Sequence, residues 1–577
     1  MSNFLFCKKN QRINIPSKVD IINSFSDITD NSIKYFENEN FILCFDESSS
    51  VKYHTNGSDV FLIFGSAIYN DKLIDNDCLS DVISSLNDKS DFDKLSGRFV
   101  LIHFSDSSAK IIDSIFSSFP HYSAFENSIH SSSLYMLNKL FCFGLNINAV
   151  SERILFFSNY GKTIINDVVR VEPASIFSFS KSIDSASYLN GLIKPIKNLD
   201  LSVAADLISS RMEKLLSKYF QGNKKASLSF TGGRDSRLLL CQLMKIMDKD
   251  NIKLFTVGKS SDIEYSVGKK FSDIHKVEHL LFTPTGLNGL NLDKYSKMIG
   301  NINFPCQYKD QYIDYLKEFK PIMVNTAIPE TVLCHLAYFE GNAHPALNFV
   351  KNRSSNFDKS NVLNGENIEA NVFNEAQISW DKLSENLPNE TITKIFFELT
   401  TFQRDWVYNI LRASDYSGAT VCVMEDPEIL SILSSVDESY LSTDILYETI
   451  ISRHYSFLYD APTTRQLASN NFLSLKLSMI VKNFDTILKS FFDVSSLGYL
   501  TEKNQDFIKA NLKENHEKLL ITFDADFLER LFVRLDSSKY TKNRLINLYK
   551  RKIIKNGYIS DYDLLIPLCV ASLLNNY

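Results

Sequence analysis

The sequence is poor in glycine and tryptophan, and its cysteines do not cluster. The 577 residues include only 19 Gly and 2 Trp against 43 Phe and 26 Tyr, a balance that excludes fibrous repeats and long disordered tracts. Nine cysteines lie scattered from Cys7 to Cys569, none of them in a C-x-x-C spacing. We therefore expect buried thiols rather than a disulfide framework or a zinc site, and a reducing compartment, the cytoplasm.

Long hydrophobic runs and an excess of basic charge are also missing. The formal net charge of −6 disfavours nucleic acid as a partner. The longest late apolar run, Leu564–Leu574, is too short to cross a bilayer and contains Pro567, so we expect core and no membrane partner. The first residues lack the order of a secretory signal. The ten histidines form no cluster with metal-ligand spacing.

Residues 1–190 carry the pattern of a β-rich domain. Short apolar or alternating runs are separated by Ser, Asn, Asp and Gly turns, which predicts sheets with few helices. The runs are Phe41–Phe45, Val60–Phe64, Phe99–Phe104, Lys110–Ile115 and Ile176–Phe179. The apolar pattern then lapses between residues 190 and 200, so we expect a domain boundary there.

Helix and strand patterns alternate after residue 200. The sequence predicts helices over 201–220, 234–247 and Ile263–Phe271 and strands over Ala226–Phe230, Lys253–Val257 and Val277–Phe282. Such alternation is typical of a parallel sheet flanked by helices. From about residue 385 the pattern is mostly helical.

The most informative stretch runs from Leu228 to Arg237, where an apolar strand enters two adjacent glycines and then a helix. Gly232 and Gly233 allow the backbone to turn and to bring bare N–H groups onto an anion. The following helix points its positive dipole end the same way. A plain strand-turn-helix corner is the alternative, and Asp235 and Ser236 are also common helix caps. Their position directly behind the glycines favours phosphate binding.

The motif Thr231-Gly232-Gly233-Arg234-Asp235-Ser236 resembles the Ser-Gly-Gly-x-Asp-Ser pyrophosphate motif of the asparagine synthetase superfamily. Thr231 keeps the hydroxyl of the first serine. Residues 254–258, Asp262-Ile263-Glu264-Tyr265 and His279 resemble that family's second strand, its Asp-x-Glu-Tyr-Ala helix and a recurrent histidine. Weaker matches lie at Arg404-Asp405, Arg412, Asp415 and Val423–Ile429.

The first half resembles the class II glutamine amidotransferase domain that precedes the synthetase domain in this family. Leu95-Ser96-Gly97-Arg98-Phe99 and Tyr160-Gly161-Lys162-Thr163-Ile164 look like its landmarks. The resemblance implies an α/β protein in which an Ntn-hydrolase-like sandwich (1–195) precedes a PP-loop ATP pyrophosphatase domain with a parallel sheet (200–480). A helical C-terminal extension would follow (481–577).

The implied activity is AMP-forming amide synthesis with ATP and Mg²⁺, similar to that of lasso-peptide macrocyclases and β-lactam synthetases. A small-molecule or peptide carboxylate would be adenylated, and an amine would displace AMP. The sequence leaves the oligomeric state open, and a homodimer or a complex with biosynthetic partner proteins are the alternatives. A non-catalytic nucleotide-binding or scaffold protein of the same fold is the alternative. A tRNA-modifying enzyme is a third, which the charge disfavours.

The resemblance also implies which residues form the site. The glycines would bind the β and γ phosphates through N–H groups, Thr231 and Ser236 would add hydroxyls, and Asp235 would hold Mg²⁺. The residues expected at ATP are Ser229, Thr231, Gly232, Gly233, Arg234, Asp235, Ser236, Thr256, Val257, Asn325, Thr326 and Glu330, with Asp235 and Glu330 at the metal and Asp235, Arg465 and Lys476 as catalytic groups. Arg234 and Arg237 would contact phosphate or lie on a solvated face.

The sequence departs from the family pattern at three places. Ser2 stands where the glutaminase nucleophile would be a cysteine, and Cys7 is internal, so we expect no glutamine hydrolysis. After the predicted strand Ile322–Val324, the expected glycine-rich loop is replaced by residues 325–330, where Pro329 removes a further N–H donor. Asn325, Thr326 and Glu330 would substitute in part. The family's late lysine has no clear counterpart, so Arg465 or Lys476 would carry that charge.

Overall fold

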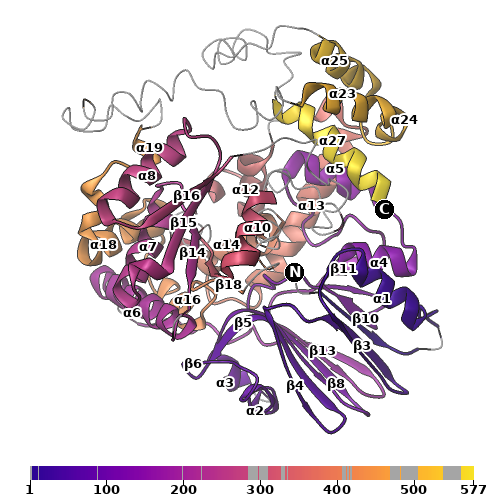
Figure 1. Ribbon diagram of the computed structural model, residues 1–577, viewed down its shortest axis with the longest axis horizontal. Helices are drawn as coiled ribbons and strands as arrows, with labels where there is room; N and C mark the ends of the chain where they lie inside the picture. Colours follow the sequence, from indigo (N-terminus) through magenta and orange to yellow (C-terminus); the bar gives the residue numbers. More distant parts are fainter. Residues whose placement is uncertain are drawn as a thin grey trace.

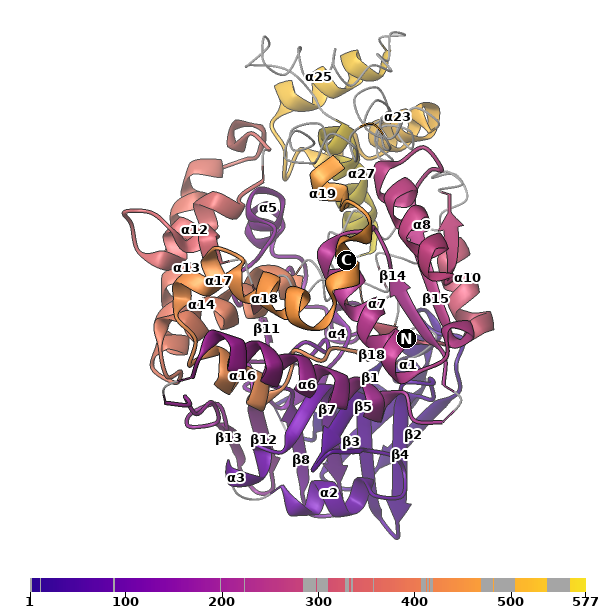
Figure 2. The same ribbon diagram turned by 90° about the vertical axis from the view of Figure 1, so that its left-hand side faces the viewer.

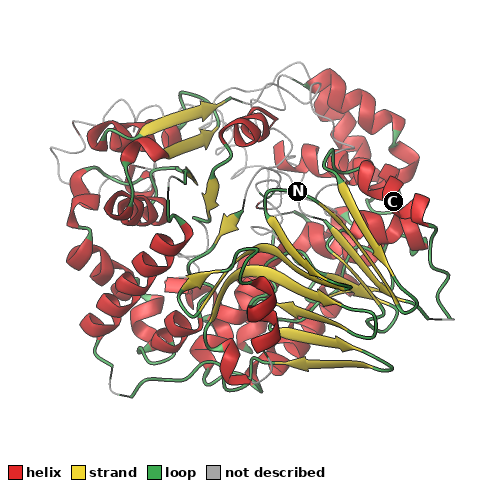
Figure 3. Cartoon of the chain, turned by 60° about the horizontal axis from the view of Figure 1, so that its bottom comes forward, coloured by secondary structure: helices red, strands yellow, loops and turns green. Residues whose placement is uncertain are grey.

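The computed structural model is a mixed α/β molecule with two antiparallel sheets and one parallel sheet. It describes residues 3–467, 481, 504–536 and 561–576, except 11, 87–88, 198, 223, 284–296, 298–309, 327–331, 334–335, 356, 406–410, 412–414 and 416–418. Figure 3 shows the long antiparallel strands gathered in one part of the molecule and helices dominating the rest. The two-part architecture that the resemblance implies is therefore present.

The first half is a sandwich of two antiparallel sheets. One sheet has the order β11 (Val168–Arg170), β9 (Tyr122–Ala124), β10 (Ile129–Ser131), β1 (Phe4–Lys8), β3 (Phe41–Asp46) and β2 (Ile33–Glu37). The other has β13 (Ile183–Ser187), β12 (Ser175–Phe179), β8 (Ala109–Asp113), β7 (Leu95–Phe104), β5 (Asp59–Tyr69) and β4 (Val51–Asn56), with β6 (Lys72–Leu73) beside β5. The predicted strands of this half are confirmed.

Phenylalanine fills the space between these two sheets. Alternate residues of each strand point inward, and the buried layer that results includes Phe4, Phe6, Phe41, Phe45, Phe64, Phe104, Phe177 and Phe179. Helices cover the outer faces, and those of this half are α1 (Lys18–Ser26), α2 (Leu79–Ser85), α3 (Lys89–Phe92), α4 (Leu134–Phe141) and α5 (Ile147–Phe156). The abundance of Phe in the sequence is thus used in part to build this layer.

The second half contains a five-stranded parallel sheet. Its order is β16 (Glu278–Phe282), β15 (Ile252–Val257), β14 (Ala226–Ser229), β17 (Ile322–Val324) and β18 (Thr420–Val421). Helix α6 (Leu201–Tyr219) precedes β14, and α7 (Arg234–Ile246), α8 (Ile263–His275) and α10 (Asp310–Phe319) connect the strands. Figure 1 shows α7 and α8 on one side of the sheet and α10 on the other. The predicted parallel sheet is confirmed, and β18 is an addition that the sequence did not indicate.

The strand order reverses at β14. From β14 the chain builds outward through β15 to β16, and it then crosses to the opposite side of β14 to form β17. The connections therefore leave the carboxyl ends of β14 and β17 toward opposite sides of the sheet. Open parallel sheets bind ligands at such a switch point.

The described chain beyond residue 330 is mainly helical, so the helical part begins earlier than the predicted start at about residue 385. Its longer helices are α12 (Pro345–Arg353), α13 (Gly365–Ser384), α14 (Glu390–Glu398), α16 (Pro427–Leu433), α18 (Ile445–His454), α23 (Gln505–Glu514), α25 (Ala525–Asp536) and α27 (Asp561–Asn576). Shorter turns are η1 (Lys249–Asn251), η4 (Leu336–Phe339), η5 (Lys359–Asn361), η6 (a π-helix, Leu399–Gln403), α17 (Glu438–Ser442), η7 (Ser456–Asp460), α19 (Thr464–Leu467) and α24 (His516–Leu519).

The late apolar run lies in α27, where residues from Leu565 to Leu573 are buried against the other C-terminal helices. The prediction that it forms core is confirmed. Across the described ranges, none of the helices is both long enough and apolar enough to span a membrane.

The cysteines of the described segments are free thiols. Five of them, Cys7, Cys44, Cys241, Cys422 and Cys569, are buried, whereas Cys78 is half-buried and Cys142 is exposed. The prediction of buried thiols therefore holds for most of them. Within the same segments no group of three or more His, Cys, Asp and Glu side chains could hold a metal ion.

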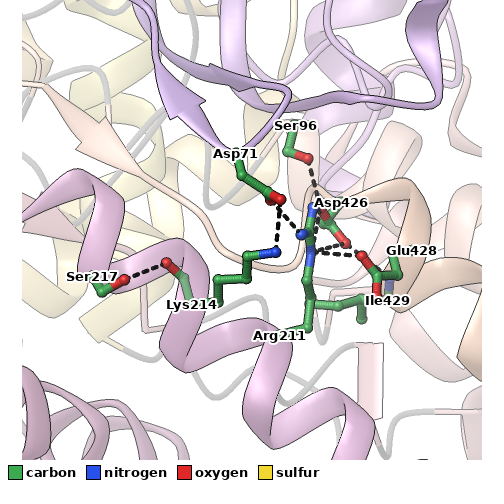
Figure 4. A network of polar contacts seen from close by, with 8 residues as sticks. All are labelled: Asp71, Ser96, Arg211, Lys214, Ser217, Asp426, Glu428 and Ile429. Carbon is green, nitrogen blue, oxygen red and sulfur yellow. Dashed lines mark hydrogen bonds and ion pairs between the residues drawn. The ribbon is translucent and has the colours of Figure 1, made fainter.

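Charged side chains join the sandwich to the second half (Figure 4). The carboxylate of Asp426, which caps α16, accepts hydrogen bonds from Ser96 Oγ at 2.5 Å and from Arg211 Nη2 at 2.7 Å. Arg211 also donates to Asp71 at 2.8 Å. The ion pair of Arg98 and Asp415, at 2.8 Å, is almost fully buried. Figure 2 shows α6 and α16 directly above the strands of the sandwich.

The landmark Leu95–Phe99 is part of this interface. Ser96 and Arg98 reach the second half through their side chains, and Gly97 N donates to the carbonyl of Glu425 at 2.8 Å. Breaking a buried ion pair by removing one partner costs about 3 to 5 kcal/mol. The two halves are therefore held in one fixed arrangement.

Glu425 makes this interface sensitive to pH. Its side chain is fully buried and accepts a hydrogen bond from Ser118 Oγ at 2.6 Å, and burial raises the pKa of its carboxyl to about 7. A raised carboxyl pKa favours the protonated folded state, so this stabilisation is complete below pH 4.5 and is lost as the pH rises toward 7. We expect the free energy of unfolding to fall by about 3 kcal/mol over that window.

Urea unfolding of the wild type and of Glu425→Gln from pH 4.5 to 8 measures this contribution. The glutamine keeps the shape and a donor for the interface but cannot ionise, so its stability should fall much less with pH. Parallel pH profiles for the two proteins would show that Glu425 does not titrate in this range.

Candidate functional site

The predicted phosphate motif forms a tight turn between the central strand and a helix. β14 ends at Ser229, Gly232 has a φ of +72°, and Gly233 is the N-cap of α7 with φ −72° and ψ 172°. Asp235 lies in the first turn of α7, and Ser236 Oγ donates to the carbonyl of Gly233 at 3.2 Å. We call residues 231–236 the cradle. It lies at the carboxyl end of β14, at the switch point of the sheet.

Gly232 is needed for the packing of α8 against the cradle. A Cβ atom on Gly232 would lie 2.7 Å from Val267 Cγ1 and 2.8 Å from the backbone nitrogen of Gly268. Its positive φ is also a conformation that other residues rarely adopt. A bare backbone at this position therefore lets a second helix approach the turn.

A buried hydrogen-bond chain braces the strand below the cradle. Thr256 Oγ1 donates to the carbonyl of Phe230 at 2.6 Å and lies 2.9 Å from His279 Nε2. Because the threonine hydrogen is directed to the carbonyl, His279 Nε2 acts as the second donor. Burial lowers the pKa of His279 to about 4, so the ring is neutral at pH 7. The recurrent histidine is thus a brace that holds β14, β15 and β16 in register.

This brace limits how Thr256 can contact a nucleotide. Its hydroxyl is engaged within the sheet and its side chain is buried, so only its backbone remains for adenine. Val257, the last residue of β15, is half-buried at the same edge. Beyond it, the amide of Lys259 donates to Asp262 Oδ2 at 2.8 Å, which shapes the loop that leads into α8.

The end of β17 lies beside the cradle, as the predicted site requires. Asn325 follows β17 directly, is 3% exposed, and donates its backbone N–H to Val421 at 3.0 Å. Thr326 follows and is half-buried. The structure therefore places Asn325 and Thr326 at the same edge of the sheet as Thr231–Ser236. Glu330 and Lys476 lie outside the described residues, as does the side chain of Arg465 on α19.

Arg234 is directed toward α18. Its Nη1 donates to Asp444 Oδ2 at 3.1 Å and to Glu448 Oε1 at 3.2 Å, and its guanidinium lies over the ring of Tyr447. A guanidinium placed between two carboxylates is already neutralised. Its role at phosphate stays a prediction, and it would require Arg234 to exchange these partners.

Arg237 adopts neither of the two expected arrangements. It is 1% exposed, and its guanidinium donates to the carbonyls of Leu458, Ala461 and Pro462 at 3.0, 2.6 and 2.7 Å. The prediction that Arg237 lies on a solvated face is therefore wrong. In the structure its guanidinium donates to backbone carbonyls, where the other prediction expected phosphate. Thr464 adds a contact that the sequence did not indicate, since its Oγ1 donates to the carbonyl of Thr231 at 2.5 Å.

The cradle fits a polyphosphate better than it fits a metal ion alone. The N-terminus of the 13-residue helix α7 presents its first-turn N–H groups and its positive dipole end to this site. Asp235 is the carboxylate at this end of the helix. Mg²⁺ needs only one or two carboxylates when phosphate oxygens complete its coordination. The donor set is therefore suited to a magnesium-bound nucleotide.

The start of β1, where the family's glutaminase nucleophile would lie, is filled by internal hydrogen bonds. Asn3 donates through N and Nδ2 to Asp46 at 2.9 and 2.8 Å, and Phe4 N donates to Ser132 Oγ at 3.0 Å. Cys7 lies on β1 with no exposed surface, and burial raises the pKa of its thiol to about 12. A thiol this weakly acidic is inert as a nucleophile. Ser2 lies outside the described residues.

Comparisons with known proteins give no family. No protein-family model matches the chain, and no curated protein matches its sequence. Among solved structures the chain is similar to a glutamine phosphoribosylpyrophosphate amidotransferase from B. subtilis complexed with ADP and GMP, with 6% identity, 49% of this chain and 66% of that chain covered, and a TM-score of 0.22.

Two further solved structures are similar over part of the chain. An allosteric regulatory enzyme of purine biosynthesis has 5% identity, 56% and 89% coverage and a TM-score of 0.24. An NH3-dependent NAD synthetase from Campylobacter jejuni subsp. jejuni, in complex with nitrate, has 13% identity, 33% and 99% coverage and a TM-score of 0.19. Likenesses at this level leave the function to be inferred from the geometry of the site.

Proposed function

We propose that the protein is an ATP-dependent, AMP-forming amide-bond synthetase related to the asparagine synthetases. The observation that carries the proposal is the cradle, two glycines and a first-turn carboxylate at the N-terminus of α7, placed at the switch point of a parallel sheet. Joining a carboxylate to an amine in water requires activation of the carboxylate. A nucleotide site at the carboxyl edge of the sheet is suited to that step.

The residues of the cradle have distinct tasks in this proposal. The N–H groups of Gly232 and Gly233 bind the β and γ phosphates, and Thr231 and Ser236 add hydroxyl donors. Asp235 would hold Mg²⁺, which would supply positive charge beside the departing pyrophosphate. A substrate carboxylate oxygen attacks the α-phosphorus and pyrophosphate leaves. An amine then attacks the acyl carbon, AMP leaves, and the amine loses a proton.

The amine is proposed to come directly from a substrate rather than from glutamine. Cys7 is buried and weakly acidic, and the start of β1 is occupied by the Asn3–Asp46 contacts. Peptide macrocyclisation or modification of a polysaccharide would supply both groups in this way. The free thiols of the described cysteines support a reducing compartment.

A second candidate is a non-catalytic nucleotide-binding or scaffold protein with the same architecture. It is favoured by the segment 325–330, which lacks glycine and contains Pro329, so fewer N–H groups can converge on pyrophosphate there. The two candidates differ in whether a bound nucleotide turns over.

Two measurements test the proposal. Calorimetry with Mg-ATP should show binding, and mass spectrometry after incubation with Mg-ATP and the host's metabolite or peptide pool should show AMP and a product lighter by one water. Binding without AMP release would favour the scaffold. Absence of binding would contradict the synthetase and would leave a scaffold that binds no nucleotide.

A further inference from the structure

A segment that follows α18 in the chain, residues 456–467, is tied to the cradle through Arg237. This arginine lies one turn into α7, and its guanidinium reaches the carbonyls of Leu458, Ala461 and Pro462. These residues belong to the segment 456–467, which runs from η7 to α19. A single side chain of α7 thereby contacts three positions of a stretch of chain that lies far away in the sequence.

The burial of Arg237 shows how specific this tie is. The side chain is 1% exposed, the ring of Phe271 lies 4.5 Å from its guanidinium carbon, and its polar partners within the described residues are carbonyls rather than a carboxylate. Removing a guanidinium from water is costly unless its donors are satisfied. A buried arginine here is therefore stable only when the segment stays in the geometry that presents these carbonyls.

The same segment holds the cradle directly. Thr464 Oγ1 donates to the carbonyl of Thr231 at 2.5 Å. The carbonyl of Thr231 and the N–H of Gly232 belong to one planar peptide group, and in a trans peptide they point in opposite directions. Holding the oxygen in place therefore fixes the direction of the first N–H donor of the cradle.

A cavity of about 230 Å³ lies between these elements. It is lined by Arg234, Arg237, Asp444, Glu448, Thr463 and Gln466, together with apolar side chains. The segment 456–467 is one wall of this cavity, and α7 and α18 are the others. The segment is thus a wall beside the nucleotide site and at the same time a support of the cradle.

We propose that Arg237 and Thr464 are positioning residues of the nucleotide site. Arg237 holds the segment 458–464 in place, and Thr464 then locks the peptide between Thr231 and Gly232 in the orientation that binds phosphate. The inference rests on the proposed nucleotide binding. The two residues support the phosphate motif from outside, because the supporting segment lies more than 200 residues away in the sequence.

Replacement of Thr464 by valine tests the lock without disturbing the core. Thr464→Val removes one hydrogen bond at constant volume, and Mg-ATP affinity measured by calorimetry should fall about tenfold. Thr464→Ser restores the hydroxyl and should restore the affinity. Thr449→Val, which removes a hydroxyl bonded within α18, is the matched control and should bind as the wild type does.

Hydrogen exchange separates this inference from the proposed function. In Thr464→Val and in Arg237→Met, amides of 456–467 should exchange faster while the rest of the chain is unchanged. Wild-type affinity in Thr464→Val, or unchanged exchange of the segment in both variants, would overturn the inference. If the wild type binds no Mg-ATP, the proposed function fails, and the exchange of 456–467 alone decides whether the segment is held as described.

Discussion

Replacing Asp235 by asparagine is expected to abolish the exchange of labelled pyrophosphate into ATP that the wild type should carry out in the presence of a panel of candidate carboxylic acids. The amide has the size of the carboxylate and can still cap the first turn of α7, but it has no charge with which to hold Mg²⁺. Without that charge, the negative charge that develops on departing pyrophosphate is uncompensated. Loss of one preorganised electrostatic contact of this kind costs about 100-fold to 1,000-fold in rate.

The control for this variant is Asp273→Asn, a substitution near the C-terminal end of the neighbouring helix α8. Asp273 is exposed and pairs with Lys269 on its own helix, so its loss should leave exchange unchanged. Thermal unfolding should show that both variants fold, because an acidic residue in a first helical turn contributes only about 0.3 to 1 kcal/mol. Exchange at the wild-type rate in Asp235→Asn would remove Asp235 from the chemistry.

Among substitutions that add one methyl group to the cradle, Gly232→Ala is expected to lower the free energy of unfolding most. The methyl group would meet Val267 Cγ1 at 2.7 Å and Gly268 N at 2.8 Å, and backbone atoms of α8 cannot move as a side chain can. Overpacking costs about 1 to 3 kcal/mol, and a left-handed conformation without glycine costs about as much again. We expect a loss of about 2 to 5 kcal/mol in the free energy of unfolding and the loss of Mg-ATP binding.

Gly222→Ala is the matched control for this prediction. Gly222 has a φ of +78°, close to the +72° of Gly232, but among the described residues no atom beyond its chain neighbours lies within 4 Å of the position of an added Cβ. It therefore reports the conformational cost alone, and the difference between the two variants in urea unfolding gives the cost of the collision with α8. Equal destabilisation by the two substitutions would show that α8 can move away from the added methyl group without a loss of free energy of unfolding.

The fold could be predicted where the signal is local. The alternation of apolar runs along 201–282 identifies β14, β15, β16 and the helices between them, because each element is long enough to show its period. β18 escaped the same reasoning, since two residues, Thr420 and Val421, have no period. It joins the sheet because β17 offers it a partner, and that is a property of the tertiary structure.

The candidate site, like the fold, could be predicted from the sequence only where its residues are neighbours in the chain. The cradle could be identified because its glycines, Asp235 and Ser236 are contiguous. The partners of Arg234 and Arg237 could not, because they lie 210 and more residues away along the chain. The roles of Arg465, Lys476 and Glu330 stay predictions. Separation in sequence, rather than unusual chemistry, is what conceals the supports of this site.

The sandwich covers one edge of the parallel sheet, because β7 contacts the turn after β18. β18 is the edge strand on that side, and it packs against β5 and β7 of the sandwich. An uncovered edge invites pairing with other chains, and Asp415, Glu425 and Asp426 would lose their partners in the sandwich. We therefore expect a chain shortened to its second half to expose this edge and to aggregate, so the sandwich has a structural task in keeping the parallel sheet soluble.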